Sequence, residues 1–224
     1  MSSLFDRARR VLRTEGLTAL LRRTVLLATG HVFQYRTVYV FEYDIEEASE
    51  LDETDFLPRT DGFDFRIVES NLGADELEKQ GLEFRSCALN ARERLDRGAV
   101  AFCIFVGGEL ASIGWAAMSQ DAKDTLPELP YTIDFAAGEA CGADIWTDPK
   151  FRRMGLRAYN RFRRLEYLRA HGIRTLRSAI GKGNVAAQRG HSKAAPRMRA
   201  EGRFLKVLLW KWWKETPVKE VEKA

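Results

Sequence analysis

The sequence of 224 residues predicts a mixed α/β fold, and three observations support that class. Gly107, Gly108 and Glu109 separate two short apolar, β-branched runs at 100–106 and 110–119, which is a hairpin pattern. A strand at about 139–147, a helix opening near Gly155 and a strand at 173–180 follow in the order of a βαβ unit. The length suits one α/β domain with an appendage.

The elements before the hairpin follow from periodicity. Residues 3–28 carry apolar positions at helical spacing with arginines between them, which predicts an amphipathic helix. Residues 32–43 and 63–70 predict strands, separated by an acidic connector that runs through Pro58. Residues 74–97 predict helix with a break at Gly81.

The elements after the hairpin are set by turn residues. Pro149 closes the strand at 139–147, and Gly172 ends the helix that opens near Gly155. A short helix is expected from Asn184, and the run FLKVLLWKWW at 204–213 predicts one final strand. The expected organisation is an N-terminal part at 1–62, a domain at 63–215 and a polar tail at 216–224.

Charge is segregated along the chain. Residues 41–83 contain 15 Asp and Glu against three basic residues, a net charge of −12. Residues 150–214 contain 19 Lys and Arg against two Glu, a net charge of +17. The two segments are expected to neutralise each other in part, and the remaining basic excess indicates an anionic partner. A phosphorylated cofactor, an anionic lipid and a nucleic acid are the candidates.

Cysteine and histidine usage excludes several classes. Cys87, Cys103 and Cys141 are far apart and show no metal-ligand spacing, and the chain has three His. No structural metal site is expected, and a reducing cytoplasm is favoured. No run reaches the roughly 20 apolar residues of a membrane span, and no cleavable signal pattern follows the basic N-terminus.

The turn between the predicted strand and helix, Thr147 to Arg157, reads TDPKFRRMGLR. The first backbone N–H groups of a helix lack intrahelical acceptors, and the helix dipole places partial positive charge at that end. Arg152 and Arg153 add charge, and Gly155 lets the backbone approach a ligand without a Cβ. The turn is therefore a candidate anion site, although a basic helix start at the surface has the same pattern.

The longer run WTDPKFRRMGLRAY resembles the acyl-coenzyme A motif of the GNAT N-acetyltransferase superfamily. Arg152 and Gly155 occupy motif positions, and Asp148, Pro149 and Phe151 match the residues that usually precede them. Arg157 departs from the small residue expected there. The resemblance covers about residues 63–213 and includes Asn184, Ala187 and His191, but Ala195 and Pro196 replace the usual Gly-Phe.

The resemblance implies a mostly antiparallel sheet with a splayed central strand, helices on both faces, and acetyl-coenzyme A or another acyl-coenzyme A as the bound species. Backbone of the splayed strand pairs with the pantetheine arm, turn amides hold the pyrophosphate, and one Asn lies beside the arm or the sulfur. In this chain the implied cofactor-binding residues are Ile145, Trp146, Thr147, Arg152, Arg153, Met154, Gly155, Leu156, Arg157 and Asn184.

Catalytic candidates follow from the same reaction, which needs a base for the amine and an acid for the leaving thiolate. His191 stands where the family often has a Tyr that protonates the thiolate, and His titrates near neutral pH. Glu139 and Asp144 lie on the motif strand and are the base candidates, or else partners of nearby arginines. Strict alternation places Glu139 with Cys141, and Asp144 with Gly142 and Trp146 on the other face.

Two function classes therefore stand. The first is an N-acyltransferase that moves an acetyl or other acyl group from acyl-coenzyme A to an amine, such as a sugar, an amino acid or an envelope precursor. The second is a weakly active or inactive acyl-coenzyme A-binding module associated with a membrane surface or a protein. Residues 3–28 and the Trp-rich 207–213 are consistent with contact with a membrane surface on the cytoplasmic side, or else with a helix packed on its own domain and an edge strand that covers the core. Nucleic-acid binding is not expected, because no recognition motif accompanies the basic segment.

Overall fold

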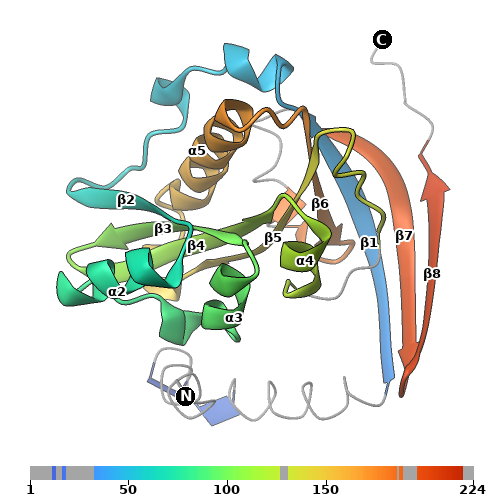
Figure 1. Cartoon of the computed structure of the whole chain (residues 1–224), viewed down its shortest axis with the longest axis horizontal. Coiled ribbons are helices and arrows are strands. Elements are labelled where there is room, and N and C mark those ends of the chain that lie inside the picture. Colours follow the sequence, from blue (N-terminus) through green and yellow to red (C-terminus); the bar gives the residue numbers. More distant parts are fainter. Residues whose placement is uncertain are drawn as a thin grey trace.

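The computed structural model of the chain describes residues 12–13, 17–18, 33–126, 131–185, 187–188 and 196–218. These residues form one eight-stranded sheet of order β2-β3-β4-β5-β6-β1-β7-β8 (Figure 1). All neighbouring strands are antiparallel except β5 and β6. The strands are β1 (Phe33–Asp44), β2 (Phe63–Val68), β3 (Val100–Val106), β4 (Glu109–Ala117), β5 (Glu139–Thr147), β6 (Thr175–Gly181), β7 (Arg197–Val207) and β8 (Trp210–Pro217).

Helices cover both faces of the sheet, so the predicted mixed α/β class is confirmed. The long helix α5 (Leu156–Ala170) lies on one face, and α2 (Asn71–Lys79), α3 (Ala91–Asp96) and α4 (Gln120–Asp124) lie on the other (Figure 1). Each face has its own apolar cluster, one around Trp115 and one around Phe102. Within the part of the chain that the structure describes, no helix is long and apolar enough to cross a membrane.

Helix α5 begins and ends at the predicted glycines. Gly155 precedes its first residue with φ of +83°, and Gly172 follows its last turn with φ of +73°. Positive φ is the conformation that glycine adopts without steric cost. The strand–turn–helix order of the βαβ unit is therefore set locally.

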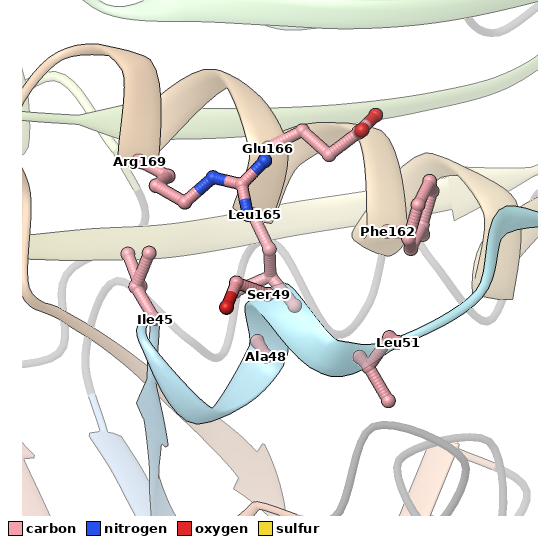
Figure 2. A pocket seen from close by; sticks show the side chains of 8 residues that line it. All are labelled: Ile45, Ala48, Ser49, Leu51, Phe162, Leu165, Glu166 and Arg169. Carbon is pink, nitrogen blue, oxygen red and sulfur yellow. The ribbon is translucent and has the colours of Figure 1, made fainter.

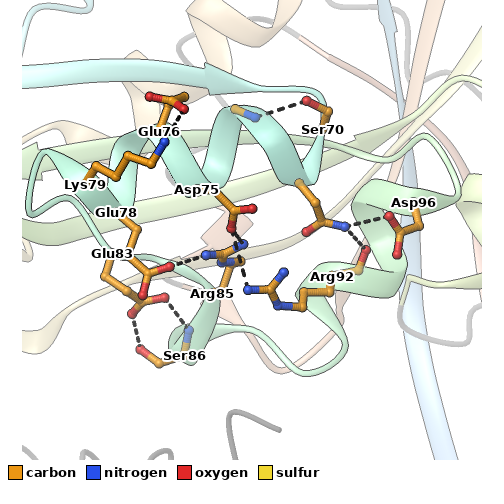
Figure 3. Close-up of polar contacts among 12 residues, drawn as sticks. Ser70, Asp75, Glu76, Glu78, Lys79, Glu83, Arg85, Ser86, Arg92 and Asp96 are labelled. Carbon is orange, nitrogen blue, oxygen red and sulfur yellow. Dashed lines mark hydrogen bonds and ion pairs between the residues drawn. The ribbon is translucent and has the colours of Figure 1, made fainter.

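The predicted helix at 74–97 is divided into two helices. Its two parts, α2 and α3, are separated by a loop that contains η3 (Arg85–Cys87). Figure 3 shows the reason for this arrangement: the buried Arg85 guanidinium binds Asp75 at 2.5 Å and also Glu78, both on α2. A buried guanidinium needs such carboxylate partners, so the ion pairs fix the loop against α2.

Strand β1 lies inside the sheet rather than in a separate N-terminal part. It pairs with β6 on one side, with Tyr43 opposite Leu176, and with β7 on the other, with Val38 opposite Gly202. The expected boundary between residues 62 and 63 therefore separates strands of one sheet. The predicted helix at 3–28 lies almost entirely outside the described residues.

The acidic connector after β1 packs along α5. Its two short helices are η1 (Glu47–Glu50) and η2 (Glu53–Asp55), and Phe56 stacks on Phe162 of α5 at 5.1 Å between ring centroids. Glu53 accepts a hydrogen bond from Tyr159 at 2.9 Å and pairs with Arg163 of α5 at 3.4 Å. The connector thus neutralises part of the basic excess, as the charge segregation predicts.

The prediction of one final strand at 204–213 is wrong. The chain turns at Leu208 and Leu209, and β7 and β8 form an antiparallel hairpin with Val207 opposite Trp210. The turn has no Gly, Asn or Pro to mark it, and Leu208 itself adopts φ of +55°. Strand β8 continues to Pro217, so it includes the first two residues of the predicted tail.

Candidate functional site

The two parallel strands at the centre of the sheet separate toward their C-terminal ends. Residues 139–142 of β5 pair with residues 175–178 of β6, and no pair follows Gly142. Beyond that point, Trp146 and Thr147 pair only with β4 on the other side. The β6-facing edge of β5 at Ile145 to Thr147 is thus available to an extended ligand, as the family resemblance implies.

A cavity of about 620 Å³ lies at this separation. Its volume is in the range of small-molecule sites. Its lining residues come from β1, the region of α4, the loop before β5, β5, and the end of β6 with the turn after it: Tyr35, Arg36, Thr37, Val38, Lys123, Leu126, Tyr131, Cys141, Gly142, Ala143, Asp144, Ala179, Gly181, Lys182, Gly183 and Asn184.

A second, smaller pocket lies between the acidic connector and α5 (Figure 2). Ile45 and Leu51 line it from one side and Phe162 and Arg169 from the other. Its volume of about 30 Å³ is close to that of one water molecule. It is too small for a cofactor, so the cavity at the strand separation is the candidate site.

The turn before α5 is held in place from both ends. The Asp148 carboxylate accepts a hydrogen bond from the Lys150 backbone N–H at 3.0 Å, and the Met154 carbonyl accepts one from the Arg59 N–H at 2.8 Å. Arg153 and Gly155 both have positive φ, of +70° and +83°. A Cβ on Gly155 would lie 3.6 Å from the Leu57 carbonyl oxygen, so the connector packs closely against this glycine.

The turn presents positive charge outward. Arg152 and Arg153 are exposed, and no described carboxylate lies within ion-pair distance of either. Leu156 is buried and anchors the first turn of α5 in the apolar cluster. The amides that follow Gly155 lie in that first turn and lack intrahelical acceptors. Together these groups form an outward cationic turn at the place where the sequence predicts an anion site.

Arg157 points inward and does not swing out toward a ligand. Burial, together with the nearby Arg161 charge, lowers the pKa of Arg157 to about 10, and its Nε is buried without a hydrogen-bond acceptor. Arg157, Arg161 and Arg164 occupy helical spacing on one side of α5, and the Arg161 guanidinium lies 5.8 Å from the Tyr43 ring centroid. The residue expected to be small therefore begins a buried arginine row.

Arg164 is almost completely buried, as Arg161 is. Its Nη1 donates to the Trp115 carbonyl oxygen at 3.2 Å, and no described carboxylate pairs with it. Two glycines make room for it: a Cβ on Gly114 would lie 3.3 Å from its Nη1, and one on Gly142 would lie 3.5 Å from its Cζ. Burial lowers the pKa of Arg164 to about 10 because the guanidinium leaves water without a counter-charge.

Replacing Arg164 with Met should raise the free energy of unfolding of the ligand-free protein by about 1–3 kcal/mol, because an apolar chain fills the same space without the desolvation cost. Between about pH 10 and the usual pKa of an arginine, the folded protein binds fewer protons here than the unfolded chain, so the penalty is complete below about pH 10 and lessens above it. Urea unfolding at pH 7 measures the change, with the exposed Arg169→Met as control. A loss of stability in Arg164→Met would mean that its bond to Trp115 outweighs desolvation.

Both base candidates on β5 are held in ion pairs. Glu139 contacts Arg177 at 2.5 Å and also accepts from the Asp134 N–H at 2.6 Å. Asp144 contacts the buried Arg94 at 2.7 Å. The arrangement matches the alternative in which these carboxylates neutralise arginines.

The predicted alternation along β5 is wrong beyond Ala143. The register against β4 shifts between Ile113 and Trp115, and Asp144 adopts φ of +49°. This irregularity turns the Asp144 carboxylate toward Arg94 on α3, which is the face of the sheet where Trp146 also packs. Gly142 lies on the opposite face, toward α5. A bulge adds a residue to one strand and therefore reverses the faces that follow it.

The two predicted residues after β6 have different outcomes. Asn184 lines the cavity, and its Oδ1 accepts from the Ala187 N–H at 3.1 Å, which caps the short helix expected there. Asn184 thus combines a position at the site with a local structural role. His191 lies outside the described residues. Among the described residues, no group of His, Cys, Asp or Glu has a metal-binding arrangement.

Tyr131 and Cys141 are the cavity residues that sequence reasoning missed. The Tyr131 hydroxyl lies 2.9 Å from the Cys141 sulfur, and both side chains are buried. Burial raises the pKa of Tyr131 well above its usual value and also raises the pKa of Cys141, so both are protonated at neutral pH. One sequence signal could have indicated this contact. Tyr131 and Cys141 stand on either side of a turn at 134–138, after which the chain enters β5.

The geometry defines a class: an α/β protein with a central strand separation, a cationic turn at one end of it and a cavity inside it. No protein-family model and no curated protein matches the chain. Solved structures do match, and the fold is that of the GCN5-related N-acetyltransferases, the GNAT superfamily.

One of these matches is the glucosamine N-acetyltransferase region of a fungal multi-domain β-N-acetylglucosaminidase, with a TM-score of 0.51 and 10% identity over 85% of this chain and 23% of that one. A GCN5-related N-acetyltransferase-like protein from Streptococcus suis matches with a TM-score of 0.48 and 15% identity, over 90% of this chain and 69% of its own. The chain spans 58% to 69% of the length of seven of the matched structures.

Proposed function

We propose that the protein is an N-acyltransferase that moves an acetyl or other acyl group from acyl-coenzyme A to an amine. The observation that carries the proposal is the continuity of three features: the cationic turn at Arg152 and Arg153, the unpaired edge of β5, and the cavity beside Cys141. A pyrophosphate, an extended amide-containing arm and a thioester need these features in this order.

The turn and the strand edge bind and orient the donor. The first amides of α5 and the two exposed arginines bind phosphate oxygens, where charge-assisted hydrogen bonds are strong. The β6-facing edge at Ile145 to Thr147 pairs with the amides of the arm, as an added strand pairs with a sheet edge. These contacts direct the thioester toward the cavity, close to Gly142, where β5 and β6 separate.

Tyr131 donates a proton to the leaving sulfur in this proposal. The amine nitrogen bonds to the acyl carbon, the carbon–sulfur bond breaks, the amine proton leaves to solvent, and Tyr131 regains a proton from solvent after the products leave. The Tyr131 hydroxyl and the Cys141 sulfur lie 2.9 Å apart and either can donate to the other, so Cys141 orients the hydroxyl until the leaving thiolate takes its place as acceptor. Glu139 and Asp144 act as positioning groups, because each is already engaged by an arginine.

The acceptor is an amine that also carries negative charge. Arg36 and Lys123 line the cavity together with Lys182, which pairs with Glu201. Asp144 is the one carboxylate among the described lining residues and already pairs with Arg94. A net positive wall favours an anionic acceptor by raising its local concentration. An amino sugar phosphate, an amino acid or a nucleotide-linked envelope precursor has that chemistry.

A thiol-release assay with acetyl-coenzyme A tests the proposal. An amine panel should include neutral amino sugars, their phosphates and amino acids, and we expect acceptor-dependent thiol release that is fastest with an anionic amine. Calorimetry with coenzyme A alone measures binding separately. Absence of both binding and release at millimolar coenzyme A contradicts the proposal.

An acyl-coenzyme A-binding module without turnover is the second candidate. The observation that favours it is that both carboxylates on β5 are in ion pairs, so neither is a free base. In the thiol-release assay this candidate predicts coenzyme A binding without release for every amine in the panel.

A further inference from the structure

The tip of the β7–β8 hairpin is apolar and fully accessible. Leu208 is 60% exposed, Leu209 is 95% exposed and Trp210 is 57% exposed. Tight turns usually contain Gly, Asn or Asp, whereas this one exposes two leucines and holds Leu208 at φ of +55°. The exposed leucines are poorly hydrated, and the backbone of Leu208 is strained. A turn with Gly or Asn would connect the two strands without these costs.

The tip is part of a larger apolar end of the sheet. Phe33 at the start of β1 lies opposite Val207, which in turn lies opposite Trp210. Both Phe33 and Val207 are exposed. The start of β1 and the hairpin turn lie together at one end of the long strands (Figure 1). The apolar tip, defined as Phe33 and Val207 to Trp210, is thus continuous across β1, β7 and β8.

Positive charge lies directly behind the apolar tip. Lys206 is opposite Lys211, and Arg203 is opposite Lys214. Arg203 also pairs with Glu201 at 3.5 Å. An anionic surface attracts such a group of basic side chains, and Lys side chains can extend along an apolar surface while their ammonium groups reach the negative charge.

We propose that the apolar tip inserts into the interfacial region of a lipid bilayer that contains anionic headgroups. The two leucines enter the boundary of the acyl chains, and Trp210 lies at the interface, which Trp favours. The cationic pairs lie about 3–13 Å behind the tip, at about 3.3 Å per residue, and meet the headgroups. The ligand is a membrane surface, and the site is separate from the cavity.

One shallow anchor binds a bilayer weakly, so stable attachment needs a second contact. The basic amphipathic pattern at residues 3–28 precedes β1, which begins at Phe33. In the sequence, this basic pattern ends five residues before Phe33, which belongs to the apolar tip.

A second copy of the chain is the competing occupant, because β8 is the edge strand of the described sheet. Pairing two β8 strands would bring Lys211 and Lys214 of each copy close together. Mutual repulsion opposes that contact, whereas the same charges favour an anionic surface. The bilayer is therefore the occupant that the charge pattern supports.

Co-sedimentation of the full chain with vesicles tests the inference and needs no turnover. We expect binding to phosphatidylcholine vesicles that contain 30% phosphatidylserine, and at least tenfold weaker binding to phosphatidylcholine alone. Leu208→Asp with Leu209→Asp should weaken binding to the anionic vesicles at least tenfold. Leu72→Asp is the matched control, since Leu72 is 72% exposed on α2 and lies away from the hairpin.

A charge test complements the tip variant. Lys206→Glu with Lys211→Glu should reduce binding to anionic vesicles and remove its salt dependence. Equal vesicle binding by the parent and the tip variant overturns the inference. So does a parent that is dimeric without vesicles and becomes monomeric in the tip variant, because the tip then serves a second copy. Coenzyme A binding by every variant shows that the domain remains folded.

Discussion

Replacing Tyr131 with Phe should lower kcat for acceptor-dependent thiol release by about 100-fold, with little change in KM for acetyl-coenzyme A. A positioned acid typically contributes 10²–10⁴-fold, and the Tyr131 hydroxyl is the buried donor at the cavity wall beside Cys141. The substitution removes one oxygen from an apolar environment, so the packing of the ring is retained. Steady-state kinetics with the best acceptor measures the effect.

Tyr35→Phe is the matched control for this variant. Tyr35 lines the same cavity but is exposed at the start of β1, so removing its hydroxyl should leave kcat within about twofold. Cys141→Ala should give an intermediate loss because it removes only the group that orients Tyr131. Unchanged turnover in Tyr131→Phe would assign proton donation to another group, with His191 the next candidate.

Reversing the charge of both exposed arginines of the turn should weaken coenzyme A binding at least 100-fold. Each charge-assisted hydrogen bond to a phosphate contributes about 1.5–3 kcal/mol, and a tenfold change in Kd corresponds to about 1.4 kcal/mol. Arg152→Glu with Arg153→Glu removes two such contacts and adds repulsion. Calorimetric titration with coenzyme A measures the loss, and pantetheine, which lacks the pyrophosphate, should bind the parent and the variant equally.

The double variant should remain folded, which makes the result interpretable. Both arginines are exposed, and acidic residues near a helix N-terminus interact favourably with its dipole. Arg174→Glu is the control, since Arg174 is exposed after α5 and makes no described ion pair. If the control weakens binding as much as the double variant, net charge rather than the turn is responsible.

Local patterns predicted the centre of the fold well. Glycines mark the β3–β4 hairpin and both ends of α5, and Pro149 marks the end of β5, because each imposes a backbone conformation within a few residues. The β7–β8 turn was not predicted because it contains no such residue. Leu208 takes a conformation that no glycine announces, and pairing with β1 and β8 stabilises it.

The candidate site was predicted only where it is local. Arg152, Arg153 and Gly155 lie in one turn, so their common role is readable from their spacing. Glu139 and Asp144 are engaged by Arg177 and Arg94, which are distant in sequence, and this pairing could not be derived from β5 alone. The bulge at Asp144 depends on the register against β4 and was equally inaccessible.

By itself, the sequence determined a strand–turn–helix unit with an outward cationic turn, because helix ends, glycines and charge act over a few residues. Only the tertiary structure decided which arginines are exposed and without a carboxylate partner among the residues that it describes, and so are able to bind an anion. Arg163, Arg177, Arg197 and Arg199 pair with distant glutamates, while Arg164 is buried. The tertiary structure also brought Tyr131 to Cys141 and the apolar tip to the start of β1. Burial and pairing are properties of surfaces that meet only when the chain is folded.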